Sequence, residues 1–234
     1  MKKLFPNKPS MKELVAFTLA EVLIVLGIIG VVAEMTIPTL VQNTQKQVLK
    51  SSFMKAYSTI SQAVEITKTD LGVDNIHTYY TYYDGSAYVN APEFITDFYN
   101  QLKIMGTKSY STAPVNFSKT ANAYWSAIGT EAPNQILPDG STINCMINAG
   151  MINISVDLNG PTKQPNRAGY DIFGFYVDPH DTVQPYNGDA WVWGSYAICD
   201  ATSTSVSNGL GCSYYALQDK NPADSSKGYW NTLN

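Results

Sequence analysis

The longest apolar run in the chain lies near its start, where Phe17 to Ala33 contains a single charged residue, Glu21. Extending the run to Val41 gives 25 residues. At about 1.5 Å per residue, a helix of 17 to 25 residues spans roughly 25–37 Å, about one hydrocarbon thickness. The run therefore predicts a transmembrane helix. Glu21 needs a separate explanation, because a carboxylate inside the apolar zone costs on the order of 2.5–3.5 kcal/mol.

Beyond Pro38 the apolar positions recur at spacings of three, four and seven residues, which is typical of an amphipathic helix. They are Leu40, Val41, Val48, Leu49, Phe53, Tyr57, Ile60, Val64 and Leu71. The pattern predicts one long helix over residues 17–70, of which residues 17–40 cross the membrane. Pro38 lacks an N–H group and is predicted to kink this helix. Four lysines in its second half are expected on a solvated face: Lys46, Lys50, Lys55 and Lys68.

A β region is predicted between residues 136 and 177. "STINCMI" and "MINISVDL" are separated by Asn148-Ala149-Gly150, which indicates a hairpin, and "YDIFGFYV" supplies a third strand. "WVWGSYAIC", which ends at Cys199, predicts a further strand. The fold class is therefore α+β, with the long N-terminal helix packed on an antiparallel sheet in a head of residues 71–234.

Residues 72–135 are predicted to be mostly irregular. The exception is Ala91–Leu102, which has helical spacing and places Pro92 in a first turn. Tyrosines surround a predicted turn at Asp84-Gly85 in the stretch Tyr79–Tyr88. Their rings offer apolar faces and a polar tip, which can stack on sugars or another subunit, or take part in ordinary packing.

The composition favours an extracytoplasmic protein. Only 15% of the 234 residues are charged and 16 are tyrosines, which indicates a polar but weakly charged surface. The net charge is −4, and the four lysines and one acid of the first 16 residues account for +3, which leaves −7 for the rest. Lysines before an apolar run predict that the N-terminus stays in the cytoplasm. The acidic remainder argues against nucleic acid as a partner, since phosphate binding needs clustered Lys and Arg.

Three interpretations fit a basic stretch followed by an apolar run: a signal cut after the run, an uncleaved anchor, and a signal cut before the run. The first needs a small-x-small cleavage site, for which "VVAEM" and "TIPTL" are poor candidates. The second explains the length of the run but not Glu21.

The residue order resembles the N-terminal cleavage and methylation motif of type IV pilins and type II secretion pseudopilins. In that family a basic leader ends in a small residue, followed by Phe, Thr or Ser, Leu, any residue, Glu and an apolar run, often with a proline. The matching residues here are Ala16, Phe17, Thr18, Leu19, Ala20, Glu21 and Pro38. Ala16 departs from the family, in which glycine usually precedes the cut.

The resemblance implies a processing route and a function. A prepilin peptidase would cut between Ala16 and Phe17, remove the leader of residues 1–16, and leave a Phe17 amine that is methylated. The chain would sit in the bacterial inner membrane as a single-pass protein, with a pilin-like head outside the cytoplasm, and then enter a periplasmic or cell-surface filament. The implied partners are other pilin or pseudopilin subunits, the prepilin peptidase and an inner-membrane assembly platform. The resemblance does not distinguish a pilus subunit from a pseudopilus subunit, or a major subunit from a minor one.

The resemblance also implies an assembly role for Glu21. In a filament of bundled apolar helices, the Phe17 amine of an incoming subunit can meet the Glu21 carboxylate of its neighbour. Pairing would remove a desolvation penalty of several kcal/mol per ion and would fix axial register. The alternative is an isolated, protonated glutamate tolerated by the membrane. Glu34, a second acid near the far end of the run, is expected at the outer headgroup level.

The three cysteines of an exported chain are expected to form one disulfide. We predict Cys199–Cys212, which closes a loop rich in Ser, Thr and Gly, because pilins often close their C-terminal region in this way. Cys145 leaves two other pairings open.

No cofactor is predicted. The cysteines form no CxxC pair and the chain has only two histidines, which disfavours zinc. Asp157, Asn159 and Asp171 are candidate calcium ligands, because some pseudopilins bind calcium in C-terminal loops. Their spacing does not match an EF-hand, and a structural turn around Asn159-Gly160 is the favoured interpretation.

No enzymatic activity is predicted. His180 lies between Asp178 and Asp181 in a predicted turn, and neither a Gly-x-Ser-x-Gly elbow nor a phosphate loop occurs. The sequence predicts a structural filament subunit. One alternative is a minor pilin or anchored binding protein that acts in adhesion, DNA uptake or contact with secreted substrates, which an exposed basic or aromatic patch on the head would favour. Another is an anchored ectodomain that never polymerises.

Overall fold

The computed structural model of the protein describes residues 18–123, 134–148, 150–187, 191–192, 195–196 and 198–233. The chain forms two compact units, one that ends at Thr44 and one that begins at Gln45. Helix α1 (Leu19–Leu71) contributes to both units.

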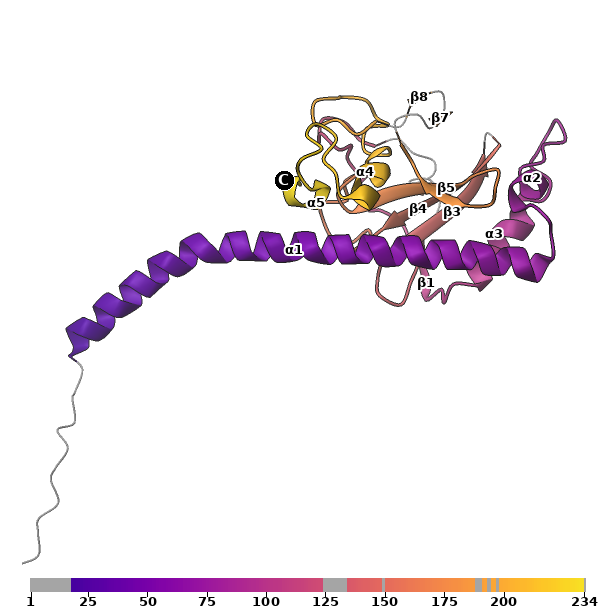
Figure 1. Ribbon diagram of the computed structural model, residues 1–234. Helices are drawn as coiled ribbons and strands as arrows, with labels where there is room; N and C mark the ends of the chain where they lie inside the picture. The colour runs from indigo at the N-terminus through magenta and orange to yellow at the C-terminus, as the bar shows by residue number, and fades with distance from the viewer. Residues whose placement is uncertain are drawn as a thin grey trace, which may run out of the picture. The chain divides into compact units, whose positions relative to one another are not determined.

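The described residues of the first unit form one continuous helix, the N-terminal part of α1 (Figure 1). Its large apolar side chains, from Leu19 to Val41, are exposed. By length and composition, α1 is the one helix among the described residues that is able to cross a membrane. Pro38 lies inside the helix without ending it. The long apolar helix is confirmed, and the kink at Pro38 stays a prediction.

The second unit contains the rest of α1 and a head with four short helices among its described residues. These are α2 (Ile76–Tyr80), α3 (Ala91–Asn100), α4 (Cys212–Gln218) and α5 (Tyr229–Thr232). α3 begins with Pro92 in its first turn, where a missing N–H group leaves no helical hydrogen bond unmade.

Six strands form one antiparallel sheet in sequence order, so that each strand pairs with its chain neighbours. They are β1 (Gly106–Lys108), β2 (Asn134–Ile136), β3 (Thr142–Asn148), β4 (Met151–Asp157), β5 (Ile172–Val177) and β6 (Val183–Pro185). β7 (Trp191–Val192) and β8 (Ser195–Tyr196) form a separate antiparallel pair. The β3–β4 hairpin turns at Gly150, whose φ of +73° suits glycine.

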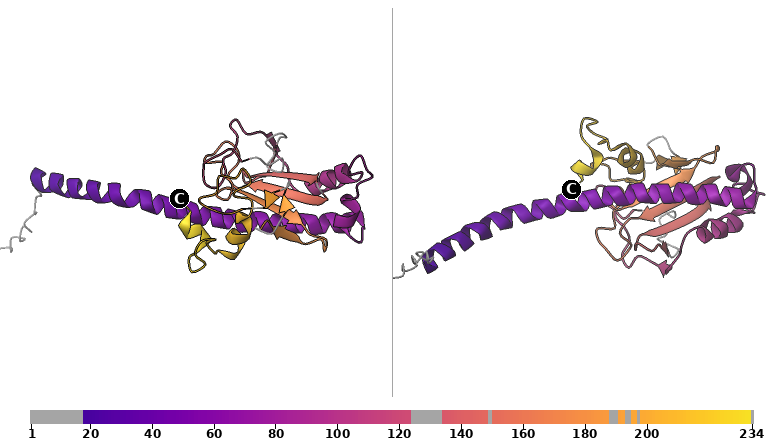
Figure 2. Two further views of the ribbon diagram at one scale, coloured as in Figure 1. Left: turned by 90° about the horizontal axis from the view of Figure 1, so that it is seen from above. Right: turned by 60° about the horizontal axis from the view of Figure 1, so that its bottom comes forward.

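In the second unit, α1 lies along one face of the sheet (Figures 1 and 2). Buried residues at spacings of three and four form the stripe that faces the strands: Leu49, Phe53, Ala56, Ile60, Ala63, Val64 and Thr67. The Phe53 ring is fully buried, with its centroid 4.8 Å from that of Phe173 in β5. Burial of one such ring contributes about 1.5–3 kcal/mol, so this stripe fastens the helix to the sheet.

The C-terminal segment completes the same core. The ring centroid of Trp230 lies 5.5 Å from that of Phe53, and its indole N–H donates to the carbonyl of Ala216 at 3.1 Å. The hydroxyl of Tyr229 donates to the carbonyl of Gly169. α4 and α5 are thereby held against the sheet.

The structure confirms the α+β class and the antiparallel sheet, with β3, β4 and β5 at the three predicted strands. Two local predictions differ. The stretch Trp191–Cys199 contains two short strands that pair with each other, not one strand. Tyr79 and Tyr80 belong to α2, because the Asn75 side chain caps that helix by accepting the N–H of Thr78 at 2.6 Å.

Candidate functional site

Reciprocal hydrogen bonds between Thr18 and Glu21 hold the start of α1. Oε2 of Glu21 accepts the backbone N–H and the hydroxyl of Thr18, both at 2.8 Å. Oγ1 of Thr18 accepts the backbone N–H of Glu21 at 3.2 Å. This arrangement is a capping box, which satisfies N–H groups that a helix start leaves without partners. Glu21 therefore has a role within its own helix.

The capping box has a local sequence signal, Thr-x-x-Glu, from which it could have been predicted. Oε1 of Glu21 accepts no hydrogen bond from any residue that the structure describes. One carboxylate oxygen is thus held by Thr18, while the other is available to a cationic group. The predicted cleavage and methylation residues, Ala16 and Phe17, lie outside the described residues.

One side of the same helix carries a shallow apolar groove, lined by Ile24, Gly27, Ile28, Val31 and Val32. A Cβ atom added at Gly27 or at Gly30 would meet nothing within 4 Å. Gly27 lines the groove, whereas Gly30 does not. Small residues let two apolar helices approach closely, so the groove fits a second helix. Glu34 is exposed further along this helix.

In the second unit, the turn after β4 is built on Asp157. Its Oδ1 accepts the N–H groups of Asn159 at 3.2 Å and Gly160 at 2.9 Å, and its Oδ2 accepts the Tyr110 hydroxyl at 3.0 Å. Asp157 is 2% exposed. Burial raises the pKa of Asp157 to about 7, and the nearby Asp171 carboxylate contributes to the rise.

Asp171 organises the other end of this turn. Its Oδ2 accepts the side-chain N–H of Asn159 at 3.2 Å and the backbone N–H of Asn166 at 3.1 Å, and its Oδ1 accepts the N–H of Arg167 at 2.6 Å. Burial raises the pKa of Asp171 to about 6, although these donors oppose the rise. The structure thus brings Asp157, Asn159 and Asp171 into one hydrogen-bonded turn.

Among the residues that the structure describes, no group of three or more His, Cys, Asp or Glu side chains is placed to hold a metal ion. The backbone N–H of His180 donates to Oδ1 of Asp178 at 2.9 Å, which confirms the predicted turn. The backbone N–H of His77 donates to Oδ1 of Asp181 at 2.9 Å. Both contacts cap the backbone.

The predicted disulfide is confirmed. Cys199 and Cys212 are bonded, and Cys145 is a buried free thiol in β3. Burial raises the pKa of the Cys145 thiol well above its ordinary value.

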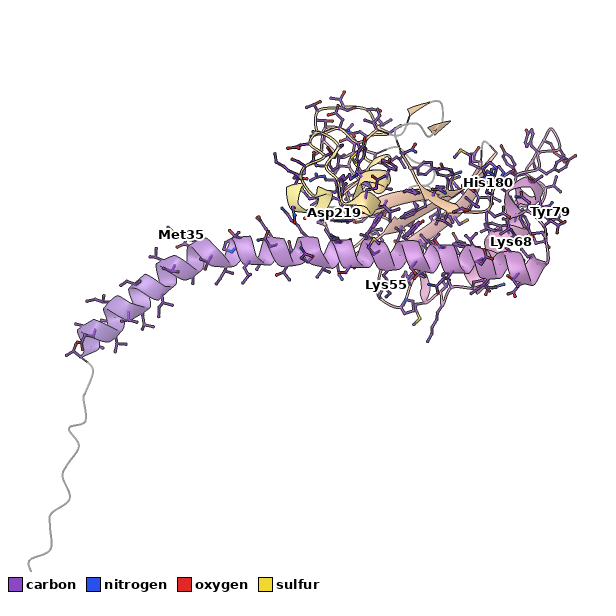
Figure 3. The ribbon with its side chains drawn as sticks, in the orientation of Figure 1. Met35, Lys55, Lys68, Tyr79, His180 and Asp219 are labelled. Carbon is purple, nitrogen blue, oxygen red and sulfur yellow. A yellow bond between two sulfur atoms is a disulfide. The ribbon has the colours of Figure 1, made fainter. Side chains whose placement is uncertain are left out.

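The four lysines on the second half of α1 contact oxygen atoms of the head; Lys55 and Lys68 are labelled in Figure 3. The side chains of Lys50, Lys55 and Lys68 are 40%, 63% and 31% exposed, so they lie at a solvated face and are also paired. The nitrogen–oxygen distances are 3.3 Å for Lys46 and the Asn231 carbonyl, 2.6 Å for Lys50 and Asp219, 2.7 Å for Lys55 and Asp139, and 2.8 Å for Lys68 and Asp181. Their partners lie far along the chain, where helical spacing gives no information.

An aromatic patch is exposed on residues 79–89, which we call the tyrosine hairpin. Tyr79, Tyr82 and Tyr83 are 45%, 60% and 52% exposed, and Val89 is 51% exposed. Oδ1 of Asp84 accepts the N–H groups of Ser86 and Ala87 and holds the turn. Within residues 79–89 the only charged residue is Asp84, so the hairpin itself is aromatic and carries no basic side chain.

Comparison with known proteins gives no match: neither a protein-family model, nor a curated protein, nor a solved structure matches this chain.

Proposed function

We propose that this chain is a structural subunit of a type IV pilus or a type II secretion pseudopilus. A prepilin peptidase cuts it between Ala16 and Phe17, and the chain waits in the inner membrane with its N-terminus in the cytoplasm and its head outside. The assembly platform then moves it into a filament of similar subunits. The observation that carries the proposal is an exposed apolar helix whose first turn holds Glu21 in a capping box with Thr18.

The capping box supports a specific assembly contact. Thr18 occupies Oε2 of Glu21 and holds the carboxylate at the helix start. Oε1 is left for the Phe17 amine of a neighbouring subunit. A charge-assisted hydrogen bond of this kind is stronger than a neutral one, and it forms only at one axial register. The exposed apolar side chains and the groove at Gly27 supply the packing surface.

Replacement of Glu21 tests the assembly contact. We expect Glu21→Ala to abolish filaments that can be sheared from cells, while the protein stays in the membrane fraction. Glu34→Ala is the matched control, since it removes the other carboxylate of the same apolar segment. Normal filament yield in Glu21→Ala, or equal losses in both variants, would contradict the proposal.

Processing has a separate test. Mass spectrometry of the mature protein, from a host with an active prepilin peptidase, is expected to show a chain that begins at a methylated Phe17. Any other start, or an uncut chain, would argue against membership of this filament class.

The tyrosine hairpin favours a second candidate function, that of a minor pilin or anchored protein whose head binds an extracytoplasmic ligand. Tyrosines at this exposure offer rigid contact area to a partner. We expect the double variant Tyr82→Ser, Tyr83→Ser to keep normal filament yield and to lose adhesion to surfaces. Undiminished adhesion in the variant would remove this candidate.

A further inference from the structure

A cavity of about 270 Å³ lies in the second unit, between α1, the segment that follows α3 and the turn between β2 and β3. Its floor consists of core side chains that keep 7–9% of their surface exposed, whereas Phe53 in the same core is fully buried. These floor residues are Ala56, Leu102, Leu137 and Leu158. The hydrophobic core is therefore open to solvent at this cavity, and covering its floor with an apolar group is favourable.

The α1 wall of the cavity supplies hydroxyl groups. Ser52, Ala56 and Thr59 line it at spacings of four and three residues, which places them on one helix face. Ser51 and Ser61, which lie outside this cavity, donate to carbonyls one turn earlier at 3.0 and 2.8 Å. The half-buried hydroxyls of Ser52 and Thr59 make no such bond to any residue that the structure describes. Two donors at the cavity wall are thus available to a ligand.

The rim of the cavity carries an excess positive charge. The ammonium nitrogen of Lys55 lies 2.7 Å from Oδ2 of Asp139, so these two lining residues neutralise each other. The third charged lining residue, Lys103, is exposed and forms no ion pair with any described residue. Gln101 also lines the cavity, and its side-chain N–H donates to Asp70, which does not line it. The charge of Lys103 is therefore left for an anionic ligand.

We propose that this cavity binds a small organic carboxylate. Its apolar body would cover the floor, and its carboxylate would accept hydrogen bonds from Lys103, Ser52 and Thr59. Charge-assisted bonds of this kind are stronger than neutral ones, and an apolar floor with a few polar groups is typical of small-molecule sites. An amine of the same shape would be repelled by Lys103. The site is independent of the proposed filament role, because all of its residues belong to the second unit.

Titration calorimetry of the full chain in detergent tests the ligand class, with detergent alone as the blank. Hexanoate has the charge and the apolar body, whereas acetate lacks the body, hexanol lacks the charge and hexylammonium reverses it. We expect hexanoate to bind saturably and the other three to bind at least about tenfold more weakly. No saturable hexanoate binding would overturn the proposal. Equal affinities for hexanoate and acetate, or for hexanoate and hexanol, would also overturn it.

Reversal of one charge tests the assignment of Lys103. We expect Lys103→Glu to weaken hexanoate binding by about tenfold or more and to leave the Tm unchanged, since the side chain is exposed. Lys108→Glu is the matched control, because Lys108 is an exposed lysine of β1 that does not line the cavity. This control is expected to keep the affinity for hexanoate. Equal weakening in both variants would show a general effect of charge and overturn the assignment.

Substitutions on the α1 wall test the location. Ser52→Phe is expected to fill the cavity and abolish hexanoate binding, whereas Ser51→Phe places the same ring outside it and should keep binding. Thr59→Val keeps the fold, because the hydroxyl that it removes makes no hydrogen bond to a described residue, and it should weaken binding without lowering the Tm. Hexanoate binding of wild-type strength in Ser52→Phe or in Thr59→Val would overturn the proposed site.

Discussion

The ammonium nitrogen of Lys68 lies 2.8 Å from Oδ2 of Asp181, a carboxylate whose side chain is 3% exposed. The same carboxylate accepts the backbone N–H groups of Ile76 at 3.1 Å and His77 at 2.9 Å. One buried side chain thus connects the end of α1, the start of α2 and the turn between β5 and β6.

Removal of Lys68 is expected to destabilise the head. Lys68→Ala leaves a buried carboxylate with only its N–H partners, and we expect the free energy of unfolding to fall by more than the loss of an exposed pair costs. Lys55→Ala is the control, because its pair with Asp139 is 63% and 38% exposed, and exposed pairs contribute about 0–1 kcal/mol. Urea unfolding of both variants measures the difference, and equal losses would contradict the prediction.

The Asp181 contact also predicts sensitivity to acid. Burial alone would raise the pKa of Asp181, but the Lys68 ammonium and the N–H groups of α2 outweigh burial and hold the pKa below the ordinary value of 3.8. Such a group stabilises the fold above its unfolded pKa, and the contribution is lost as the pH falls through the folded pKa. We expect the stability difference between wild type and Asp181→Asn to be full above about pH 5 and to shrink below about pH 4. A difference that does not change with pH would exclude this role.

Glu21→Gln separates the two roles of Glu21. Glutamine also serves in a capping box, so the helix start should be kept while the charge is lost. We expect filament yield to fall as far as in Glu21→Ala, because only a charged carboxylate pairs with the Phe17 amine. Normal filaments in Glu21→Gln would show that the residue acts only as a cap.

Gly27 and Gly30 give a test of the packing groove. We expect Gly27→Leu to fill the groove and reduce filament yield, since the added side chain keeps a second helix away. Gly30→Leu makes the same change outside the groove and should reduce the yield less. Sheared filaments from the two strains are compared by immunoblot, and a larger effect at Gly30 would place the packing face elsewhere.

The Cys199–Cys212 bridge is expected to stabilise the C-terminal part of the head. The double variant Cys199→Ser, Cys212→Ser should lose about 3 kcal/mol of unfolding free energy on the loop-entropy model. A reducing agent should destabilise the wild type by a similar amount and leave the variant unaffected. A wild type that reduction does not destabilise would contradict the prediction.

The elements that the sequence predicted most accurately are helices and strands that bury one complete face in the core. The stripe of Phe53, Ile60 and Val64 repeats at helical spacing, and β3 and β4 alternate around a glycine turn, so both appear in a single window of sequence. β1, β2 and β6 have three residues each, which is too short for a periodic signal. The capping box at Thr18 rests on the local pattern Thr-x-x-Glu, so it could have been predicted from the sequence.

The polar contacts of the head were beyond sequence reasoning. Lys68 pairs with Asp181, which lies more than a hundred residues further along the chain. Helical periodicity does not indicate which acid of the head this lysine contacts. Thr142 and Asp157 become neighbours only through strand register. Cys199–Cys212 could be favoured over the two pairings of Cys145 through the resemblance to pilins, which often close their C-terminal region in this way.

The contact between Phe53 and Trp230 also sets an order of events during synthesis. Trp230 leaves the ribosome well over a hundred residues after Phe53, and at about 5–20 residues per second this delay is on the order of ten seconds or more. The apolar stripe on α1 has no complete partner surface during this interval. The core around Phe53 is therefore completed only when the chain is nearly finished, and until then part of the apolar stripe on α1 is exposed to contact with other nascent copies.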